Sequence, residues 1–268
     1  MTVLIDTSYF YYRFAHGINA MNPGQPINTG AGILYTKSAI KRIRKRFGQT
    51  SDIVFCIDSS GNWRKQVFKQ YKAGRAKARN ENQIFDFQSF FDSLAEWKNW
   101  LNESKDVMSV GVVGAEADDV IMVLSKHVED CVIIAKDKDF QQLGREQYDM
   151  NFKLVTDPDW DMFKHILKGD VADGIPPADA PDNFFTDGRG DYVTKRMTKK
   201  HIAWLATLSR EDLESLYPFY NRNETLISAA KIPSDIESKI ITTYEFEVLA
   251  LDTKQGFFEK LIKGKTQP

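Results

Sequence analysis

The sequence has 268 residues and a mass of 30.7 kDa, which suits one large α/β domain or a main domain with a smaller helical appendage. Hydrophobic residues make up 42% of the chain and charged residues 27%, a composition that excludes a disordered or collagen-like protein. The net charge of -1 conceals a segregation: residues 37–79 contain thirteen Lys or Arg and two acids, whereas residues 103–173 contain sixteen Asp or Glu and eight Lys or Arg, so one segment should attract phosphates and the other cations.

The first residues, MTVLIDTSYFYY, contain no basic region followed by a long apolar run, which predicts neither a signal peptide nor a membrane span. We therefore expect a cytoplasmic protein. Cys56 and Cys131 each lie in an apolar run, which favours buried, reduced thiols over a disulfide or a cysteine metal site. The four histidines are scattered without the paired spacing of a zinc centre, and each is expected to be structural: His16, His127, His165 and His201.

Three short apolar runs rich in β-branched residues, TVLID, IVFCID and CVIIAKD, are typical of buried strands of a parallel sheet. Each run ends in an aspartate, namely Asp6, Asp58 or Asp137. In an open α/β sheet the carboxyl ends of the strands form the active-site edge. The three aspartates are therefore expected to meet there.

Helical patterns follow at residues 29–47 and 83–101, and again near 199–208, 210–217 and 234–245. In the second of them an apolar stripe is expected to face the core: Ile84, Phe87, Phe91, Leu94, Trp97 and Leu101. Residues 17–30 and 174–191 are predicted loops, and the last residues, LIKGKTQP, are predicted to fray. The second loop suggests two domains, 1–180 and a helical domain at 181–268.

Nine acidic residues lie where strands end or helices begin: Asp6, Asp58, Glu116, Asp118, Asp119, Asp137, Asp139, Asp170 and Asp173. Gathered in one place, they would repel one another in the absence of cations. Mg²⁺ and Mn²⁺ prefer oxygen ligands, so a carboxylate-lined basin without His or Cys favours them over zinc. The segment AEADD opens an apolar helix, and Asp137 and Asp139 would share one side of an extended chain. Taken singly, each residue is better explained as a helix cap or a solvated loop residue, and the metal interpretation depends on the set as a whole.

The stretch from Trp63 to Arg79 carries seven basic residues and no acid: Arg64, Lys65, Lys69, Lys72, Arg75, Lys77 and Arg79. A solvated helix face would normally interleave acids, so phosphate is the expected partner. In a helix Lys72 and Arg79, seven residues apart, would project from one face. The alternatives are a merely basic surface loop here and, for the KRIRKR run at 41–46, a solvated helix face instead of a contact with the duplex backbone.

The blocks CIDSSGNWRKQVFKQYKAGRAKAR, EADD, DKDFQQL and ILKGDVADG resemble those of the 5' nuclease superfamily, which includes flap endonucleases, the 5' exonuclease domain of bacterial DNA polymerase I and phage ribonuclease H enzymes. The likeness covers about the first 175 residues, and the last third matches only loosely. It implies a PIN-like α/β fold, with a parallel-type central sheet flanked by helices, a helical arch at about 60–82 and a smaller helical C-terminal DNA-binding domain.

By this resemblance, Asp6, Asp58, Asp118 and Asp137 would form one metal site, with Glu116 in its inner or outer shell. A second ion would lie near Asp139, Asp170 and Asp173, with Asp119 close by. Two Mg²⁺ ions, replaceable by Mn²⁺, would catalyse hydrolysis without a covalent intermediate, with Asp118 and Asp137 among the catalytic residues. Lys72 and Arg79 would grip the scissile phosphate, and Tyr71 would stack on a base. Gly74 lowers helicity here, so we expect the arch to become helical on substrate binding.

The resemblance implies a monomeric phage enzyme in the host cytoplasm that acts on 5' flap DNA, RNA:DNA hybrids and nicked duplex and removes RNA primers. A single-stranded DNA-binding protein is an expected partner. A sliding clamp is another, if KQGFFEKLIKGK is a clamp-binding peptide and not the end of an amphipathic helix. The family's potassium-binding hairpin is replaced by DGIPPADAPDNFFTDGRGDYVTKRMTKK, which puts a potassium site in doubt. Competing interpretations are a non-catalytic junction-binding protein on the same fold and a small PIN-type toxin ribonuclease.

Overall fold

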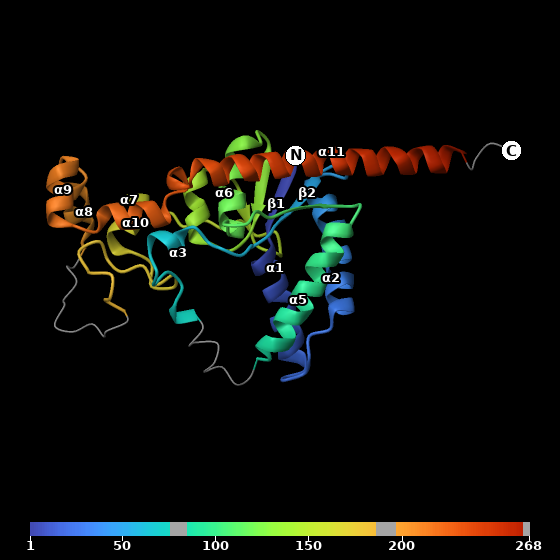
Figure 1. Cartoon of the computed structure of the whole chain (residues 1–268), viewed down its shortest axis with the longest axis horizontal. Helices are drawn as coiled ribbons and strands as arrows, with labels where there is room; N and C mark the ends of the chain where they lie inside the picture. The colour runs from blue at the N-terminus through green and yellow to red at the C-terminus, as the bar shows by residue number, and fades with distance from the viewer. Residues whose placement is uncertain (76–84, 186–196, 265–268) are drawn as a thin grey trace. The chain divides into compact units, whose positions relative to one another are not determined.

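A computed structural model of the chain describes the backbone of residues 1–75, 85–185 and 197–264 (Figure 1). The chain forms two compact units. The sheet unit contains residues 1–60, 83–156 and 234–268, and the helical unit contains residues 61–82 and 157–233. The two domains predicted from the sequence, 1–180 and 181–268, are functional assignments. The division into compact units does not test them, and they stay predictions.

The sheet unit is built on five parallel strands: β1 (Thr2–Asp6), β2 (Asp52–Cys56), β3 (Met108–Val110), β4 (Cys131–Ile134) and β5 (Gln147–Tyr148). Their order in the sheet is β3-β2-β1-β4-β5, which places the three apolar strands β2, β1 and β4 in the middle. The predicted α/β class and the three predicted strands are confirmed. The two outer strands have only three and two residues, too few for a recognisable pattern in the sequence.

Helices cover both faces of this sheet, as right-handed crossovers between parallel strands require. One face carries α1 (Thr7–Met21), α2 (Thr29–Phe47) and α5 (Phe87–Glu103), and the other carries α6 (Ala117–His127) with α11 (Ser234–Gly264) packed against it. The chain moves outward from β1 through β2 to β3 and then returns to β4 on the other side of β1. This reversal places a topological switch point between β1 and β4, where open α/β sheets bind their ligands.

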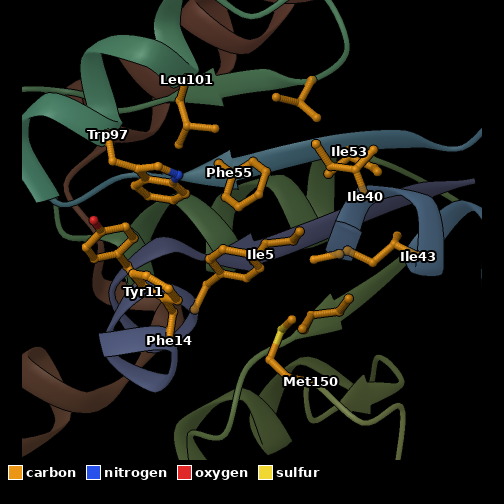
Figure 2. Close-up of a cluster of buried hydrophobic side chains, with 14 of the residues drawn as sticks. Ile5, Tyr11, Phe14, Ile40, Ile43, Ile53, Phe55, Trp97, Leu101 and Met150 are labelled. Atoms are coloured by element: carbon orange, nitrogen blue, oxygen red, sulfur yellow. The ribbon is translucent and has the colours of Figure 1, made fainter. Parts of the chain in front are cut away.

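The core beneath α1, α2 and α5 is rich in aromatic side chains (Figure 2). The ring of Phe10 stacks on Trp97 at 5.8 Å and meets Phe55 edge-on at 5.3 Å. The indole nitrogen of Trp97 donates to the hydroxyl of Thr36 at 2.9 Å, which satisfies its polar atom inside the core. One expectation was wrong: Phe91 is 45% exposed, because Phe90 takes the buried position on α5.

Two further differences from the sequence-based picture concern helix ends. The predicted loop 17–30 is shorter, because α1 continues through Gly17 to Met21 and α2 begins at Thr29, where the Asn28 side chain accepts from the Ala31 N–H. The last helix, predicted at 234–245, extends to Gly264. Cys56 and Cys131 are buried free thiols, as expected. Among the described residues, no helix has both the length and the apolar character needed to cross a membrane.

The helical unit contains α3 (Arg64–Val67), α7 (Met162–Lys168), α8 (Lys199–Leu205), α9 (Arg210–Leu216), α10 (Tyr220–Ile227) and the 3-10 turn η2 (Ala229–Lys231). Helices α8 and α9 correspond to predicted ones, whereas α10 was not predicted. Arg222 on α10 donates to the carbonyls of Pro176, Pro177 and Ala180. The neighbouring Asn223, fully buried, donates to Pro176 and to Ile166 on α7. These bonds satisfy the carbonyls of a proline-rich loop that has few amide donors of its own.

Candidate active site

Three aspartates lie at the carboxyl ends of adjacent parallel strands of the sheet unit. Asp6 ends β1 and accepts the Tyr9 N–H at 3.0 Å, which caps α1. Asp58 follows β2, and Asp137 follows β4 and caps the 3-10 helix η1 (Lys138–Leu143). Since β1 lies between β2 and β4, Asp6 has one carboxylate on each side, at the switch point of the sheet.

Asp6 and the Cys56 thiol both have raised pKa values. Burial, together with the nearby carboxylates of Asp58 and Asp137, raises the pKa of Asp6 from 3.8 to about 7, against the opposing effect of the Tyr9 N–H. The pKa of the Cys56 thiol is also raised well above 9.0, first by burial and then by Asp6, Asp118 and Asp58. Four carboxylates, those of Asp6, Asp58, Asp118 and Asp137, thus take part in the electrostatics of Asp6 and the Cys56 thiol.

Asp58 is held in place from three directions. One carboxylate oxygen accepts the Ala117 N–H at 2.9 Å, at the first turn of α6, and the other is bonded to the Ser8 hydroxyl. Its main-chain carbonyl accepts from the ammonium of Lys98 on α5 at 3.2 Å, and burial lowers the pKa of that ammonium. Sequence reasoning did not single out Lys98. The available signal was weak: it is the one basic residue in α5 and follows a core tryptophan.

The acidic segment AEADD opens α6 as predicted, with Glu116 at the cap and Ala117 as the first helical residue. Asp119 is fully buried, and its carboxylate accepts the Glu116 N–H at 2.9 Å. This contact gives Asp119 a structural role at the start of the helix. The partly buried Asp118 is the member of the segment that acts on the Cys56 thiol. The predicted place of Asp119 beside a second ion stays a prediction.

Asp137 and Asp139 do not share one side of an extended chain, because the helix η1 begins between them. The Asp137 carboxylate instead accepts the Asp139 N–H at 2.9 Å. The main-chain carbonyl of Asp137 accepts from the buried side chain of Gln147 at 2.7 Å. The loop after β4 is therefore fixed at both its backbone and its side chain. Lys136, directly before Asp137, is exposed to solvent.

In the helical unit Asp170 lies in a tight turn after α7. Gly169 precedes it with φ +67°, and a Cβ atom there would lie 2.3 Å from two carbonyl oxygens, so only glycine fits. One Asp170 oxygen accepts the Ala172 N–H at 2.8 Å, and the other lies 3.7 Å from Nε2 of His165. Both side chains are buried. His165, expected to be structural without a particular partner, is thus a neighbour of a predicted metal ligand.

The described part of the basic segment, residues 63–75, is mostly turns, with helical backbone in the short helix α3 and again at residues 74–75. Arg64 is 3% exposed and its Nε donates to the Leu226 carbonyl at 2.8 Å, and the Tyr71 ring is 2% exposed. This burial gives both residues structural roles, and it argues against the predicted phosphate contact of Arg64 and base stacking by Tyr71. Lys72 has φ +57° and lies in a turn. The prediction that it shares a helix face with Arg79 depends on a residue outside the described part of the chain, and it stays a prediction.

The remaining cations of the segment divide into two groups. Lys65, Lys69 and Arg75 are exposed to solvent, whereas the Lys72 side chain is mostly shielded. The predicted phosphate ligands Lys77 and Arg79, with the core residue Ile84, lie outside the described residues. In the KRIRKR run, Arg42 lies over the Phe152 ring and bonds to the Met150 carbonyl, and Arg46 lies over Tyr148. That run therefore has a packing role on the sheet unit.

Comparison with known proteins covers most of the chain. A family model of the 5'-3' exonuclease N-terminal resolvase-like domain matches residues 1–165, and a model of the C-terminal part of the phage T4 ribonuclease H matches residues 156–263. The ribonuclease H of Enterobacteria phage T4 is 32% identical over 221 residues, which are 75% of this chain and 71% of that protein. A 5'-3' exonuclease of Buchnera aphidicola is 26% identical over 53% of this chain, a match that spans about half, 47%, of that relative.

Solved structures with the same fold come from bacteriophage T5. A flap endonuclease in a complex with DNA and metal ions has a TM-score of 0.59 at 15% identity, over 93% of this chain and 98% of that chain. A 5'-exonuclease with zinc bound has a TM-score of 0.54 at 16% identity, over 97% of this chain and 98% of that chain. At these identities the likeness establishes the fold, a parallel sheet with flanking helices and a helical region.

Proposed function

The chain belongs to the 5'-3' exonuclease family, as its acidic blocks predicted, and on that premise we propose that it hydrolyses phosphodiesters of RNA:DNA hybrids and DNA duplexes from 5' ends or flaps. The proposed cofactors are two Mg²⁺ ions, which Mn²⁺ can replace. The names of two relatives, a ribonuclease H and a 5'-3' exonuclease, support both halves of this activity.

One observation carries the proposal: the raised pKa of Asp6 between Asp58 and Asp137. Burial is the main cause of this shift and the carboxylates of Asp58 and Asp137 add to it, so the metal-free protein keeps a buried carboxylate beside two others at an energetic cost. A divalent cation relieves the repulsion, and an all-oxygen donor set suits Mg²⁺. We propose Asp6, Asp58, Asp118 and Asp137 as ligands of one ion, with Glu116 beside them. For the second ion we propose Asp139, Asp170 and Asp173, with Asp119 nearby.

When bound, such ions supply a nucleophilic hydroxide and neutralise the charge that develops on the phosphate and the leaving oxygen. The protein's own task is to fix the ligands. The Ala117 N–H and the Ser8 hydroxyl orient Asp58, and Gln147 fixes the backbone at Asp137. Because these bonds exist without substrate, little reorganisation is needed at the moment of reaction.

Cations of the basic segment would bind the substrate's phosphates. We propose Lys72 and Arg79 as the residues at the scissile phosphate, where they act electrostatically, since an arginine does not deprotonate in the working range. Lys69, Arg75 and Lys77 are proposed as further backbone contacts. Specificity would come from the shape and the end of the substrate, because phosphate contacts carry no sequence information.

The biological setting is proposed from the phage relative: removal of RNA primers during lagging-strand replication in the cytoplasm of an infected cell. The protein would act as a monomer. A single-stranded DNA-binding protein and a sliding clamp are proposed partners, and the segment KQGFFEKLIKGK is the candidate for clamp binding.

A titration of cleavage with Mg²⁺ tests the activity directly. The substrates are a 5' flap, a nicked duplex and an RNA:DNA hybrid of matched sequence, each labelled at both ends so that exonuclease and endonuclease products differ in length. We expect metal-dependent products that carry 5' phosphates. Binding to all three substrates without cleavage at any Mg²⁺ or Mn²⁺ concentration would instead identify a non-catalytic junction-binding protein.

A further inference from the structure

The carboxylate of Asp173 makes three contacts with the basic segment of the same unit. Its Oδ2 accepts from the Tyr71 hydroxyl at 2.9 Å and lies 3.6 Å from the ammonium of Lys72. Its Oδ1 lies 2.6 Å from Nη2 of Arg75. Both carboxylate oxygens are thus engaged by groups that the sequence assigned to the nucleic acid.

Backbone contacts also join the loop that carries Lys72 to the loop that carries Asp173. The Lys72 N–H donates to the Asp173 carbonyl at 2.8 Å, and Lys72 holds a positive φ of 57°, unusual for a residue with a side chain. Gly174 follows with φ +70°, and a Cβ atom there would lie 3.1 Å from the Gln70 carbonyl oxygen. The two loops therefore lie in close backbone contact. The side chains of Lys72 and Asp173 are only 11% and 18% exposed, so water screens this ion pair less than a surface pair.

We propose that Asp173 is a positioning residue: it is the counter-ion that holds Lys72 and Arg75 in the free protein, and the substrate phosphate must displace it from them. This inference rests on the proposed function, because it takes Lys72 as a phosphate ligand. The carboxylate competes with the phosphate for the same cations. Any cation that binds Asp173 would therefore release Lys72 and Arg75 to the substrate, so that the two binding events are coupled.

The first test uses the protein alone. Trace acylation followed by mass spectrometry measures how readily each lysine reacts in the free protein. Asp173→Asn keeps an acceptor for the Tyr71 hydroxyl but removes the charge, and it should raise the labelling of Lys72 about threefold relative to Lys69, the factor expected for a modest ion pair. Arg75→Gln should lower the labelling of Lys72, because Lys72 then pairs with the Asp173 carboxylate without competition from Arg75.

Asp159→Asn is the matched control. Asp159 pairs with Lys199 at 3.0 Å on the surface of the same unit, so this variant changes the net charge by the same amount. It should raise the labelling of Lys199 and leave Lys72 unchanged. Thermal unfolding of each variant checks the fold. Equal labelling of Lys72 in wild type, Asp173→Asn and Arg75→Gln would overturn the proposal.

The second test measures binding of a 5'-phosphorylated flap oligonucleotide in EDTA at several KCl concentrations. Asp173→Asn should bind more tightly than wild type, and its log–log salt slope should steepen by about 0.7 to 1.8, since each released cation adds about 0.7 to 0.9. Unchanged affinity and slope, as expected for Asp159→Asn, would contradict the competition. A wild-type protein that neither binds this oligonucleotide nor cleaves it in Mg²⁺ would refute the proposed function, and the labelling would still decide the counter-ion role.

Discussion

Replacing Asp6 by Asn should stabilise the metal-free protein at neutral pH and above, although it removes a proposed catalytic ligand. Asn serves as well as Asp at a helix N-terminus, so the bond from the Tyr9 N–H is retained. What the substitution removes is a charge that burial and the neighbours Asp58 and Asp137 oppose. Stability and activity are therefore expected to move in opposite directions at this residue.

The sign and size of this stability change follow from the pKa of Asp6, which rises from 3.8 to about 7 on folding. An acid whose pKa is raised on folding binds its proton more tightly in the native state. The contribution of Asp6 to the free energy of unfolding is therefore fully present below about pH 3.8 and is lost as the pH rises through about 7. At about 1.4 kcal/mol per pH unit, the loss is at most about 4 kcal/mol. We expect the variant to gain about 2 to 4 kcal/mol over wild type at pH 8 and almost nothing at pH 4.

Urea denaturation in EDTA at pH values from 4 to 8 measures this difference. Asp52→Asn, at the exposed first residue of β2, controls for the loss of one negative charge from the same unit. Adding Mg²⁺ should stabilise wild type at pH 8 and reduce the stability difference between Asp6→Asn and wild type, because a ligand that binds only the native state raises its stability. If Asp6→Asn were no more stable than wild type at pH 8, or if its advantage were the same at every pH, the raised pKa of Asp6 in its buried, acidic surroundings would be refuted.

Asp137→Asn should abolish cleavage in Mg²⁺ and leave flap binding in Ca²⁺ largely intact; wild-type cleavage by this variant would remove Asp137 from the metal ligands. Trp97→Ala should lower the free energy of unfolding by about 3 to 5 kcal/mol in urea titrations, because the indole is fully buried and its N–H is bonded to Thr36; a loss below about 1 kcal/mol would mean that the packing is loose. Gly169→Ala should cost at least about 2 kcal/mol, since its Cβ would lie 2.3 Å from two carbonyl oxygens, and near-normal stability would show that the turn at Asp170 can shift.

The sequence predicts the centre of the sheet and its acidic edge because both depend on short-range patterns. The runs that end in Asp6, Asp58 and Asp137 combine β-branched residues with a terminal acid, and their parallel pairing brings those ends together. The edge strands β3 and β5 are too short to show a pattern. Their positions depend on hydrogen bonds to strands distant in the sequence, which no local window contains.

Charge patterns were less informative about individual residues than about segments. A run of cations indicates that a segment binds phosphate, but Arg64 is buried against Leu226 and Tyr71 is bonded to Asp173. These contacts join residues about 160 and 100 positions apart, so they follow from tertiary packing. The same holds for Lys98, whose ammonium reaches the Asp58 carbonyl only because α5 crosses the sheet there.

The central claim is that carboxylates from separate strands form a binding site for divalent cations. The most direct test is anomalous diffraction from a crystal soaked in Mn²⁺. The account predicts a manganese peak coordinated by Asp6, Asp58 and Asp137. Manganese absent from this edge of the sheet, with the three side chains turned apart, would contradict it.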